Sequence, residues 1–139
     1  MKILITGALG HIGSSLIRSL HKIHNIKSIY ILDNLISQRY NSLFDLPNNK
    51  FFFINEDLSK IKISSLPKTE LVVHLAAKTD AAQSHKFENE FYSNNLAATK
   101  NIIKYCKKTN AKLIFASSTS VYGPQSNVVN ENADKKELN

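Results

Sequence analysis

Short apolar runs alternate with longer polar stretches along this chain. The apolar runs have the length and composition of buried β-strands and cover residues 2–6, 28–32, 51–54, 71–75 and 112–116. Two stretches between them carry apolar residues at helical intervals: Ile12, Leu16, Leu20 and Ile23 in residues 12–24, and Phe87, Phe91, Ala98, Ile102 and Cys106 in residues 87–108. The pattern predicts an α/β protein with an open, doubly wound sheet of about five parallel strands, whose ligands bind beyond the carboxyl ends of the strands.

Length and composition limit the kinds of protein that the chain can be. Its 139 residues, 42% of them hydrophobic, are enough for one domain with a buried core. No apolar stretch approaches the roughly 18 residues that a membrane-spanning helix needs, so we expect no membrane contact. The one cysteine, Cys106, cannot form an internal disulfide, which favours a cytoplasmic location. We expect no metal site.

The charge of the chain is compatible with nucleic acid but does not predict it. The 18 lysines and arginines outnumber the 11 aspartates and glutamates, which gives a formal charge of +7. The basic residues are scattered singly or in pairs such as Lys107-Lys108, and apart from Arg18 and Arg39 all are lysine. Nucleic-acid recognition relies on clustered charge and on the planar arginine fork. We therefore interpret the excess charge as a solvated surface and expect no nucleic-acid partner.

The segment after the first apolar run carries the strongest chemical signal. Thr6-Gly7-Ala8-Leu9-Gly10-His11-Ile12-Gly13 lies between a predicted strand and a predicted helix. A dinucleotide pyrophosphate needs a tight turn, a close approach of the backbone and the free N–H groups of a helix N-terminus, which glycines at 7, 10 and 13 can provide. The succession of strand, glycine turn and amphipathic helix predicts a dinucleotide site.

The choice of dinucleotide is predicted from Asp33, just after the second apolar run. It lies 20 residues beyond Gly13, where a carboxylate can accept hydrogen bonds from the ribose 2′-hydroxyl and repels a 2′-phosphate. Residues 34–37 contain no arginine or lysine that could neutralise such a phosphate. NAD is therefore favoured over NADP as the cofactor.

Six motifs follow one another in order along the chain. They are Thr-Gly-x-x-Gly-x-x-Gly at 6–13, Asp-Asn-Leu at 33–35, Asp-Leu at 57–58, His-Leu-Ala-Ala at 74–77, Asn-Asn-Leu at 94–96 and a segment ending in Val-Tyr-Gly at 115–123. Together they resemble the extended short-chain dehydrogenase/reductase family, the NAD-dependent nucleotide-sugar epimerases and dehydratases. The resemblance implies a Rossmann-like NAD-binding domain over residues 1–124, incomplete relative to the family. A polar tail at 125–139 would begin a truncated region, with no substrate domain.

This resemblance implies roles for individual residues. The implied cofactor-binding residues follow the predicted strands or lie on the second predicted helix: Gly7, Gly10, His11, Ile12, Gly13, Asp33, Asn34, Asp57, Leu58, Leu75, Ala76, Ala77, Thr79 and Asn94. Thr79 replaces a lysine of the UDP-galactose 4-epimerases. Ser118, three residues before Val121, is implied as the catalytic hydroxyl that hydrogen-bonds the reacting sugar hydroxyl and helps to move its proton. His74 is interpreted as a structural histidine rather than a base.

The general base of the family is not found in this sequence. In the family it is a tyrosine with a lysine four residues later, which lowers a phenol pKa that is otherwise near 10 and too high for a base at neutral pH. Four residues after the tyrosines at 30, 40, 92, 105 and 122 stand Asn34, Phe44, Leu96, Thr109 and Ser126. The family spacing would put the pair just beyond Asn139, so we expect a truncated chain.

The resemblance thus implies the NAD-binding part of a nucleotide-sugar epimerase that acts by transient oxidation at sugar C4 and is inactive alone. Thr119-Ser120 replaces the acidic residue typical of 4,6-dehydratases, which favours an epimerase. A dehydratase or reductase of the family, a non-catalytic NAD-binding module and a gene fragment are the alternatives. We expect the helix face with Phe91 and Ile102 to be uncovered in this chain and the full-length relative to be a homodimer.

Overall fold

The computed structural model describes residues 1–20, 22–46, 49–79, 88–118 and 130. Its strands are β1 (Lys2–Thr6), β2 (Ser28–Asp33), β3 (Phe51–Asn55), β4 (Leu71–His74) and β5 (Lys112–Phe115). Its helices are α1 (His11–Leu20) and α3 (Glu88–Thr109), with short 3-10 turns η1 (Tyr40–Leu43) and η2 (Ile63–Ser65). Each predicted strand is confirmed to within one residue, whereas α1 ends earlier than predicted.

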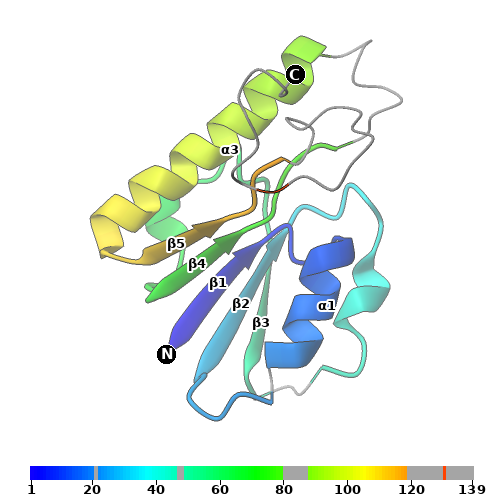
Figure 1. The fold of residues 1–139 in the computed structure, drawn as a ribbon, viewed down its shortest axis with the longest axis vertical. Coiled ribbons are helices and arrows are strands. Elements are labelled where there is room, and N and C mark those ends of the chain that lie inside the picture. The colour runs from blue at the N-terminus through cyan, green and yellow to red at the C-terminus, as the bar shows by residue number, and fades with distance from the viewer. Residues whose placement is uncertain (21, 47–48, 80–87, 119–129, 131–139) are drawn as a thin grey trace.

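The five described strands form one parallel sheet in the order β3-β2-β1-β4-β5. All the arrowheads in Figure 1 accordingly point the same way. Strand β1 is central: Leu4 pairs with Tyr30 of β2 on one side and with Val72 of β4 on the other. The chain moves outward from β1 in one direction and, after β3, in the other, so the carboxyl ends of β1 and β4 form the switch point where ligands bind in such sheets. This topology confirms the Rossmann-like α/β fold.

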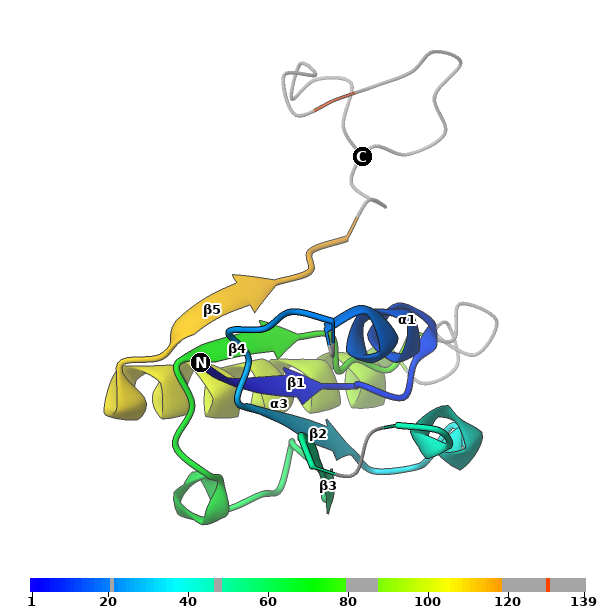
Figure 2. The same cartoon turned by 90° about the horizontal axis from the view of Figure 1, so that it is seen from below.

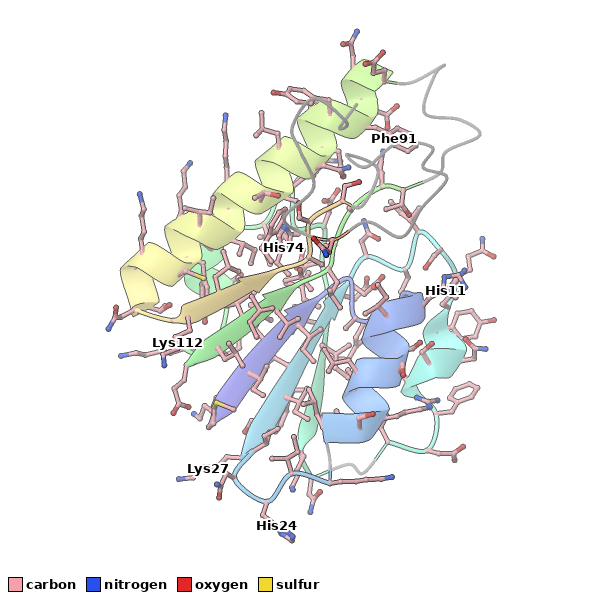
Figure 3. The ribbon with its side chains drawn as sticks, in the orientation of Figure 1. His11, His24, Lys27, His74, Phe91 and Lys112 are labelled. Carbon is pink, nitrogen blue, oxygen red and sulfur yellow. The ribbon has the colours of Figure 1, made fainter. Side chains whose placement is uncertain are left out.

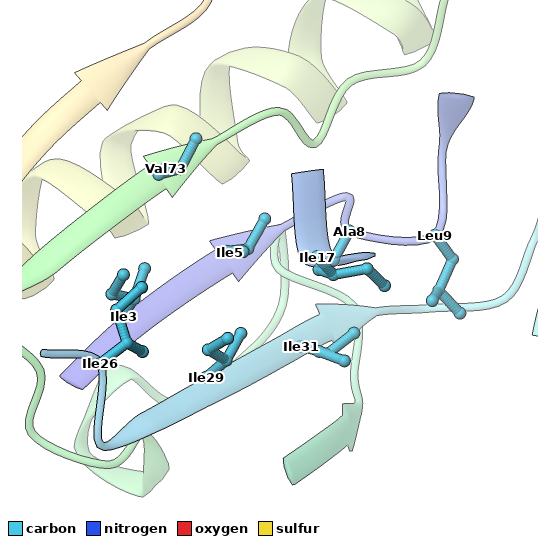
Figure 4. Close-up of a cluster of buried hydrophobic side chains, with 9 residues drawn as sticks. All are labelled: Ile3, Ile5, Ala8, Leu9, Ile17, Ile26, Ile29, Ile31 and Val73. Carbon is cyan, nitrogen blue, oxygen red and sulfur yellow. The ribbon is translucent and has the colours of Figure 1, made fainter. Parts of the chain in front are cut away.

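Each face of the sheet is covered by one of the two helices. Because side chains alternate along a strand, Ile3 and Ile5 join the core beside α1, whereas Leu4 joins the core beside α3. Figure 4 shows the first of these clusters, in which nine buried side chains fill the space between α1 and the sheet. Figures 1 and 2 show α1 and α3 on opposite sides of the sheet.

The buried face of α1 matches the predicted one in part, since Leu16 and Leu20 pack against the core as predicted, whereas Ile12 and Ile23 do not. Ile17 and Gly13 are buried, whereas Ile12 is 69% exposed and Ile23, beyond the end of the helix, is 48% exposed. The tight turn before α1 sets the rotation of the helix, because Gly13 packs directly against Ala8. The sheet-facing stripe therefore runs through positions 13, 16, 17 and 20, and position 12 faces solvent.

The predicted apolar face of α3 is confirmed at Ala98, Ile102 and Cys106, and Phe87 lies outside the described residues. The expectation that Ile102 is uncovered was wrong, since this side chain is fully buried against the sheet. Exposed apolar side chains lie instead on strand β5: Leu113, Ile114 and Phe115. Strand β5 is an edge strand that pairs only with β4 among the described strands.

The predicted boundary at residue 124 and the tail at 125–139, apart from Asn130, lie outside the described residues. Among the residues that are described, no helix combines the length and the apolar character needed to cross a membrane.

Candidate functional site

A tight turn connects β1 to α1. Gly7 has a left-handed φ of 65°, and its N–H donates to the carbonyl of Leu32 at 2.9 Å. The N–H of Gly10 donates back to the Gly7 carbonyl at 3.1 Å, and the N–H of Ser14 donates to the Gly10 carbonyl at 2.9 Å, which begins the helix. The N–H groups of the first helical turn have no acceptor within the helix, so the turn can offer them to an anion.

Two of the three glycines in this turn are required by packing. A Cβ at Gly7 would lie 2.7 Å from the Cα of Ala76, in the loop after β4, and a Cβ at Gly13 would lie 2.6 Å from the Cα of Ala8. The nearest atom to a Cβ at Gly10 is the Gly7 carbonyl oxygen, at 3.3 Å. Gly7 thus seats the turn against the neighbouring strand end, and Gly10 is the glycine with the most room beside it.

Asp33 links the end of β2 to this turn. Asp33 is buried, with 8% of its surface exposed. Its Oδ2 accepts the N–H of Leu9 at 3.1 Å, and its Oδ1 accepts the N–H of Leu35 at 3.0 Å. Each carboxylate oxygen has a further lone pair for a hydroxyl donor. The neighbouring Asn34 is exposed, and its Oδ1 accepts the N–H of Ile36 at 3.2 Å.

Asp57 follows β3 and organises the turn that it begins. Its Oδ1 accepts the N–H of Ser59 at 2.9 Å and the Ser59 hydroxyl at 2.7 Å, and Lys60 Nζ lies 3.6 Å from its Oδ2. Partial burial raises the pKa of Asp57, but the Ser59 hydrogen bonds and the Lys60 cation outweigh this and hold it below its usual value. Leu58 is 4% exposed in the core beside α3, so only its main chain can meet a ligand.

The loop after β4 lies against the glycine turn and α3. The N–H of Leu75 donates to the Thr6 carbonyl at 3.0 Å, and the N–H of Ala76 donates to the Thr6 hydroxyl at 3.4 Å. Further along this loop, Ala77 and Thr79 are exposed. The loop therefore begins in contact with β1, at the switch point of the sheet.

Two adjacent asparagines of α3 face this loop. The side chain of Asn94 donates to Asn95 Oδ1 at 3.2 Å, and Asn95 in turn bonds the main chain of Lys78. The sequence assigned no role to Asn95 on its own. The sequence signal that could have identified Asn95 is its position next to Asn94 in the Asn-Asn-Leu motif.

His74, the last residue of β4, is 2% exposed and is held on three sides. Its Nδ1 lies 2.7 Å from the Thr6 hydroxyl, and its Nε2 lies 3.1 Å from the Thr99 hydroxyl. Its ring stacks on the ring of Phe115, with 5.7 Å between the two ring centres. Figure 3 shows His74 at the carboxyl end of the sheet, away from Lys27 and Lys112. Both ring nitrogens are occupied inside the fold, as expected for a structural histidine.

His74 is expected to make stability depend on pH. Burial lowers the pKa of His74 below its ordinary value of 6.5, so the unfolded chain binds the proton more readily than the folded chain. The stability that neutral His74 contributes to the fold is present in full above the pKa of the unfolded chain. It is lost as the pH falls from that value through the lower pKa of the folded chain. Urea denaturation between about pH 7 and about pH 5 should show this loss.

His74→Gln should reduce the dependence of the free energy of unfolding on pH, although it also lowers that free energy at every pH. His24→Gln, at an exposed position, is the matched control. Equal pH dependence in the two variants would contradict this role for His74.

Ser118 and its surroundings are described only in part. Ser118 is exposed, three residues beyond the end of β5, and the N–H of Ala116 donates to the His74 carbonyl at 3.4 Å. Residues 119–123, which include the predicted Val-Tyr-Gly, lie outside the described residues. The catalytic role of Ser118 therefore stays a prediction. Within the described ranges, no three histidine, cysteine, aspartate or glutamate side chains gather as a metal site would require.

The candidate cofactor residues meet at one edge of the sheet. The glycine turn, Asp33, Asp57 and the loop after β4 all lie at or just beyond the carboxyl ends of adjacent parallel strands. His11, exposed at the N-terminus of α1, lies at the same end (Figure 3). A helix N-terminus, a glycine with room beside it and a buried carboxylate are the features that the phosphate and ribose of a dinucleotide require. The residues present fit such a ligand.

The family model for the NAD dependent epimerase/dehydratase family matches residues 3–139. The "Bifunctional protein GAL10" of Candida maltosa is 34% identical over 86% of this chain and 83% of its own sequence. The UDP-glucose 4-epimerase of Caenorhabditis elegans is 34% identical over 91% of this chain, but the match spans 40% of the relative.

A solved structure agrees with these matches. The UDP-Glc/GlcNAc 4-epimerase of Campylobacter jejuni superposes with a TM-score of 0.77 and 33% identity, over 96% of this chain and 42% of that one. The chain thus spans less than half of two of these three relatives. With its parallel sheet, glycine turn and buried carboxylate, the chain belongs to the NAD-dependent epimerase/dehydratase family.

Proposed function

We propose that this chain is the NAD-binding part of a nucleotide-sugar epimerase, with residues 1–124 as its cofactor domain. The observation that carries the proposal is the hydrogen bond from the Leu9 N–H to Asp33 Oδ2. This hydrogen bond joins the glycine turn, which is suited to bind phosphate, to the Asp33 carboxylate, which is suited to bind ribose. A dinucleotide carries both chemical features in one ligand.

The proposed contacts follow from the chemistry of each group. Gly10 and the N–H groups of His11, Ile12 and Gly13 would hold the pyrophosphate. Asp33 would accept hydrogen bonds from the adenosine ribose, with Asn34 beside it. By family resemblance, Asp57 and the main chain of Leu58 would hold the adenine. The remaining proposed contacts lie on the loop after β4 and on α3: Leu75, Ala76, Ala77, Thr79 and Asn94.

The proposed reaction is an epimerisation of a sugar joined to a nucleotide. When bound, NAD supplies a hydride acceptor for oxidation of the sugar alcohol at C4. The Ser118 hydroxyl would hydrogen-bond that alcohol and help to move its proton. Two of the three relatives described above are named as UDP-sugar 4-epimerases, which supports a nucleotide-sugar substrate. A dehydratase or reductase of the family is the second candidate, and a homodimer is proposed for the full-length enzyme.

The chain by itself is expected to bind NAD without catalysing epimerisation. NAD at a hundred times its Kd should raise the free energy of unfolding by about 2.7 kcal/mol. The same preparation should form no UDP-glucose from UDP-galactose, because no tyrosine in the sequence has a lysine four residues later. Thermal unfolding and chromatography of the sugar nucleotides measure the two results, with a complete UDP-galactose 4-epimerase as the positive control.

The two measurements test separate parts of the proposal. An unfolding free energy that does not change with NAD would refute the cofactor site. Formation of UDP-glucose would refute the view that the residues in this sequence lack the general base.

A further inference from the structure

The side chain of Asn95 holds the main chain of Lys78 at two points. Asn95 Oδ1 accepts the Lys78 N–H at 2.8 Å, and Asn95 Nδ2 donates to the Lys78 carbonyl at 3.1 Å. A side-chain amide here makes the pair of hydrogen bonds that a neighbouring strand would otherwise make. Lys78 lies beyond the end of β4, so the amide continues the restraint of the main chain where the sheet stops.

This contact fixes the far end of the loop after β4. The near end is fixed by Thr6, which bonds the N–H groups of Leu75 and Ala76 through its carbonyl and its hydroxyl. The loop also has little space to shift toward the glycine turn, because even a Cβ at Gly7 would lie 2.7 Å from the Cα of Ala76. Residues 75–78 are thus held by β1 at one end and by α3 at the other.

The contact of Asn95 with the main chain is better protected from water than the contacts of the Lys78 side chain. Asn95 is partly buried, and both of its hydrogen bonds to Lys78 are partly buried as well. The ammonium of Lys78 pairs with Glu90 and lies 5.8 Å from the centre of the Phe91 ring. Glu90 is 61% exposed, and exposed ion pairs add little stability. The amide of Asn95 therefore contributes more to the position of the loop than the ion pair does.

We infer that Asn95 is a positioning residue for the cofactor, acting through the main chain of Lys78 rather than by touching the cofactor. This inference rests on the proposed function, in which Leu75, Ala76, Ala77 and Thr79 meet NAD. With the Asn95 amide in place, these residues are already ordered before NAD arrives. Without it, NAD must order the loop on binding, which weakens its affinity.

The test replaces Asn95 and measures two properties of the whole chain. Asn95→Ala removes both bonds to Lys78 and should weaken NAD binding about tenfold, since two partly buried hydrogen bonds are lost. Hydrogen exchange at the Lys78 amide, measured without NAD, should speed up about tenfold or more. Asn95→Asp keeps the oxygen that accepts the Lys78 N–H and should fall between Asn95→Ala and the unsubstituted chain in both measurements.

Two control variants separate positioning from a general loss of stability. Tyr105→Phe removes a buried hydroxyl that bonds Thr69 and Pro67, before the amino end of β4, and should destabilise the chain while leaving NAD affinity unchanged. Glu90→Gln removes the ion pair with the Lys78 side chain and should change neither NAD affinity nor Lys78 exchange by more than about twofold.

The outcomes distinguish the inference from the proposed function. Unchanged NAD affinity or unchanged Lys78 exchange in Asn95→Ala overturns the inference, as does an equal loss of affinity in Tyr105→Phe. Failure of the unsubstituted chain to bind NAD overturns the proposed function, and the cofactor role of Asn95 falls with it. In that case faster Lys78 exchange in Asn95→Ala would establish only a structural contact.

Discussion

Replacing Gly7 by alanine is expected to lower the free energy of unfolding by about 2–4 kcal/mol. Gly7 has a φ of 65°, a conformation that costs a residue with a Cβ about 1–2 kcal/mol. The added methyl group would also lie 2.7 Å from the Cα and the N of Ala76. These are main-chain atoms held by Thr6, so relief requires the glycine turn and the loop after β4 to move apart. Urea denaturation measures the loss.

Gly10→Ala is the matched control for this prediction. Its Cβ would approach no atom closer than 3.3 Å, so the free energy of unfolding should change by less than about 1 kcal/mol. The new methyl group would stand beside the proposed pyrophosphate, so NAD affinity should still fall. Equal destabilisation by Gly7→Ala and Gly10→Ala would contradict the steric account of the turn.

Replacing Asp33 by asparagine is expected to reduce the preference for NAD over NADP by at least about tenfold. The amide has a similar shape but carries no charge, so it no longer repels a 2′-phosphate. It also places an NH₂ group where a carboxylate oxygen now accepts the N–H of Leu9 or Leu35, which weakens the link to the glycine turn. NAD affinity should therefore fall while NADP affinity falls less or rises. Calorimetric titration with each dinucleotide measures the ratio.

Asp45→Asn provides the control for the change in net charge. Asp45 is exposed and follows η1, so its loss changes the charge of the chain equally without touching the turn. It should leave the ratio of NAD to NADP affinity within about twofold, because exposed charges are screened at physiological salt. The assignment of Asp33 to the adenosine ribose would be contradicted if Asp33→Asn left the ratio of NAD to NADP affinity unchanged. It would also be contradicted if Asp45→Asn changed this ratio by as much.

The strands were predictable because parallel strands covered on both faces are continuously apolar. The runs at Lys2–Thr6 and Leu71–His74 show this pattern, and their ends could be placed to within one residue. The glycine turn was predictable for a similar reason, since its geometry depends on residues that are adjacent in sequence. Local pattern sufficed for both features.

The rotation of α1 was predictable from spacing only in part, since Leu16 and Leu20 face the core as predicted whereas Ile12 does not. Ile12 and Ile17 are both apolar, and the helical period allows either to face the sheet. The outcome depends on the contact between Gly13 and Ala8, which exists only once the turn has formed. The tertiary contact at the helix start therefore decides which of the two is buried.

The hydrogen bonds that assemble the site were beyond the reach of sequence patterns. Asp33 and Leu9 are 24 residues apart, and Lys78 and Asn95 are 17 residues apart. A motif marks a residue type at a position, but it does not show which main-chain group that residue bonds. For this reason Asp33 was identified with a ligand and not with the turn, and Asn95 was given no role.

We propose that NAD binds along the carboxyl ends of β1, β2 and β4. The most direct measurement is a titration of the unsubstituted chain with NAD, followed at each backbone amide by NMR. The largest shifts are expected at residues 9–13, at Leu35 and at residues 75–79, with little change around η2, which precedes the amino end of β4. The absence of any shift, or shifts centred on η2, would contradict it.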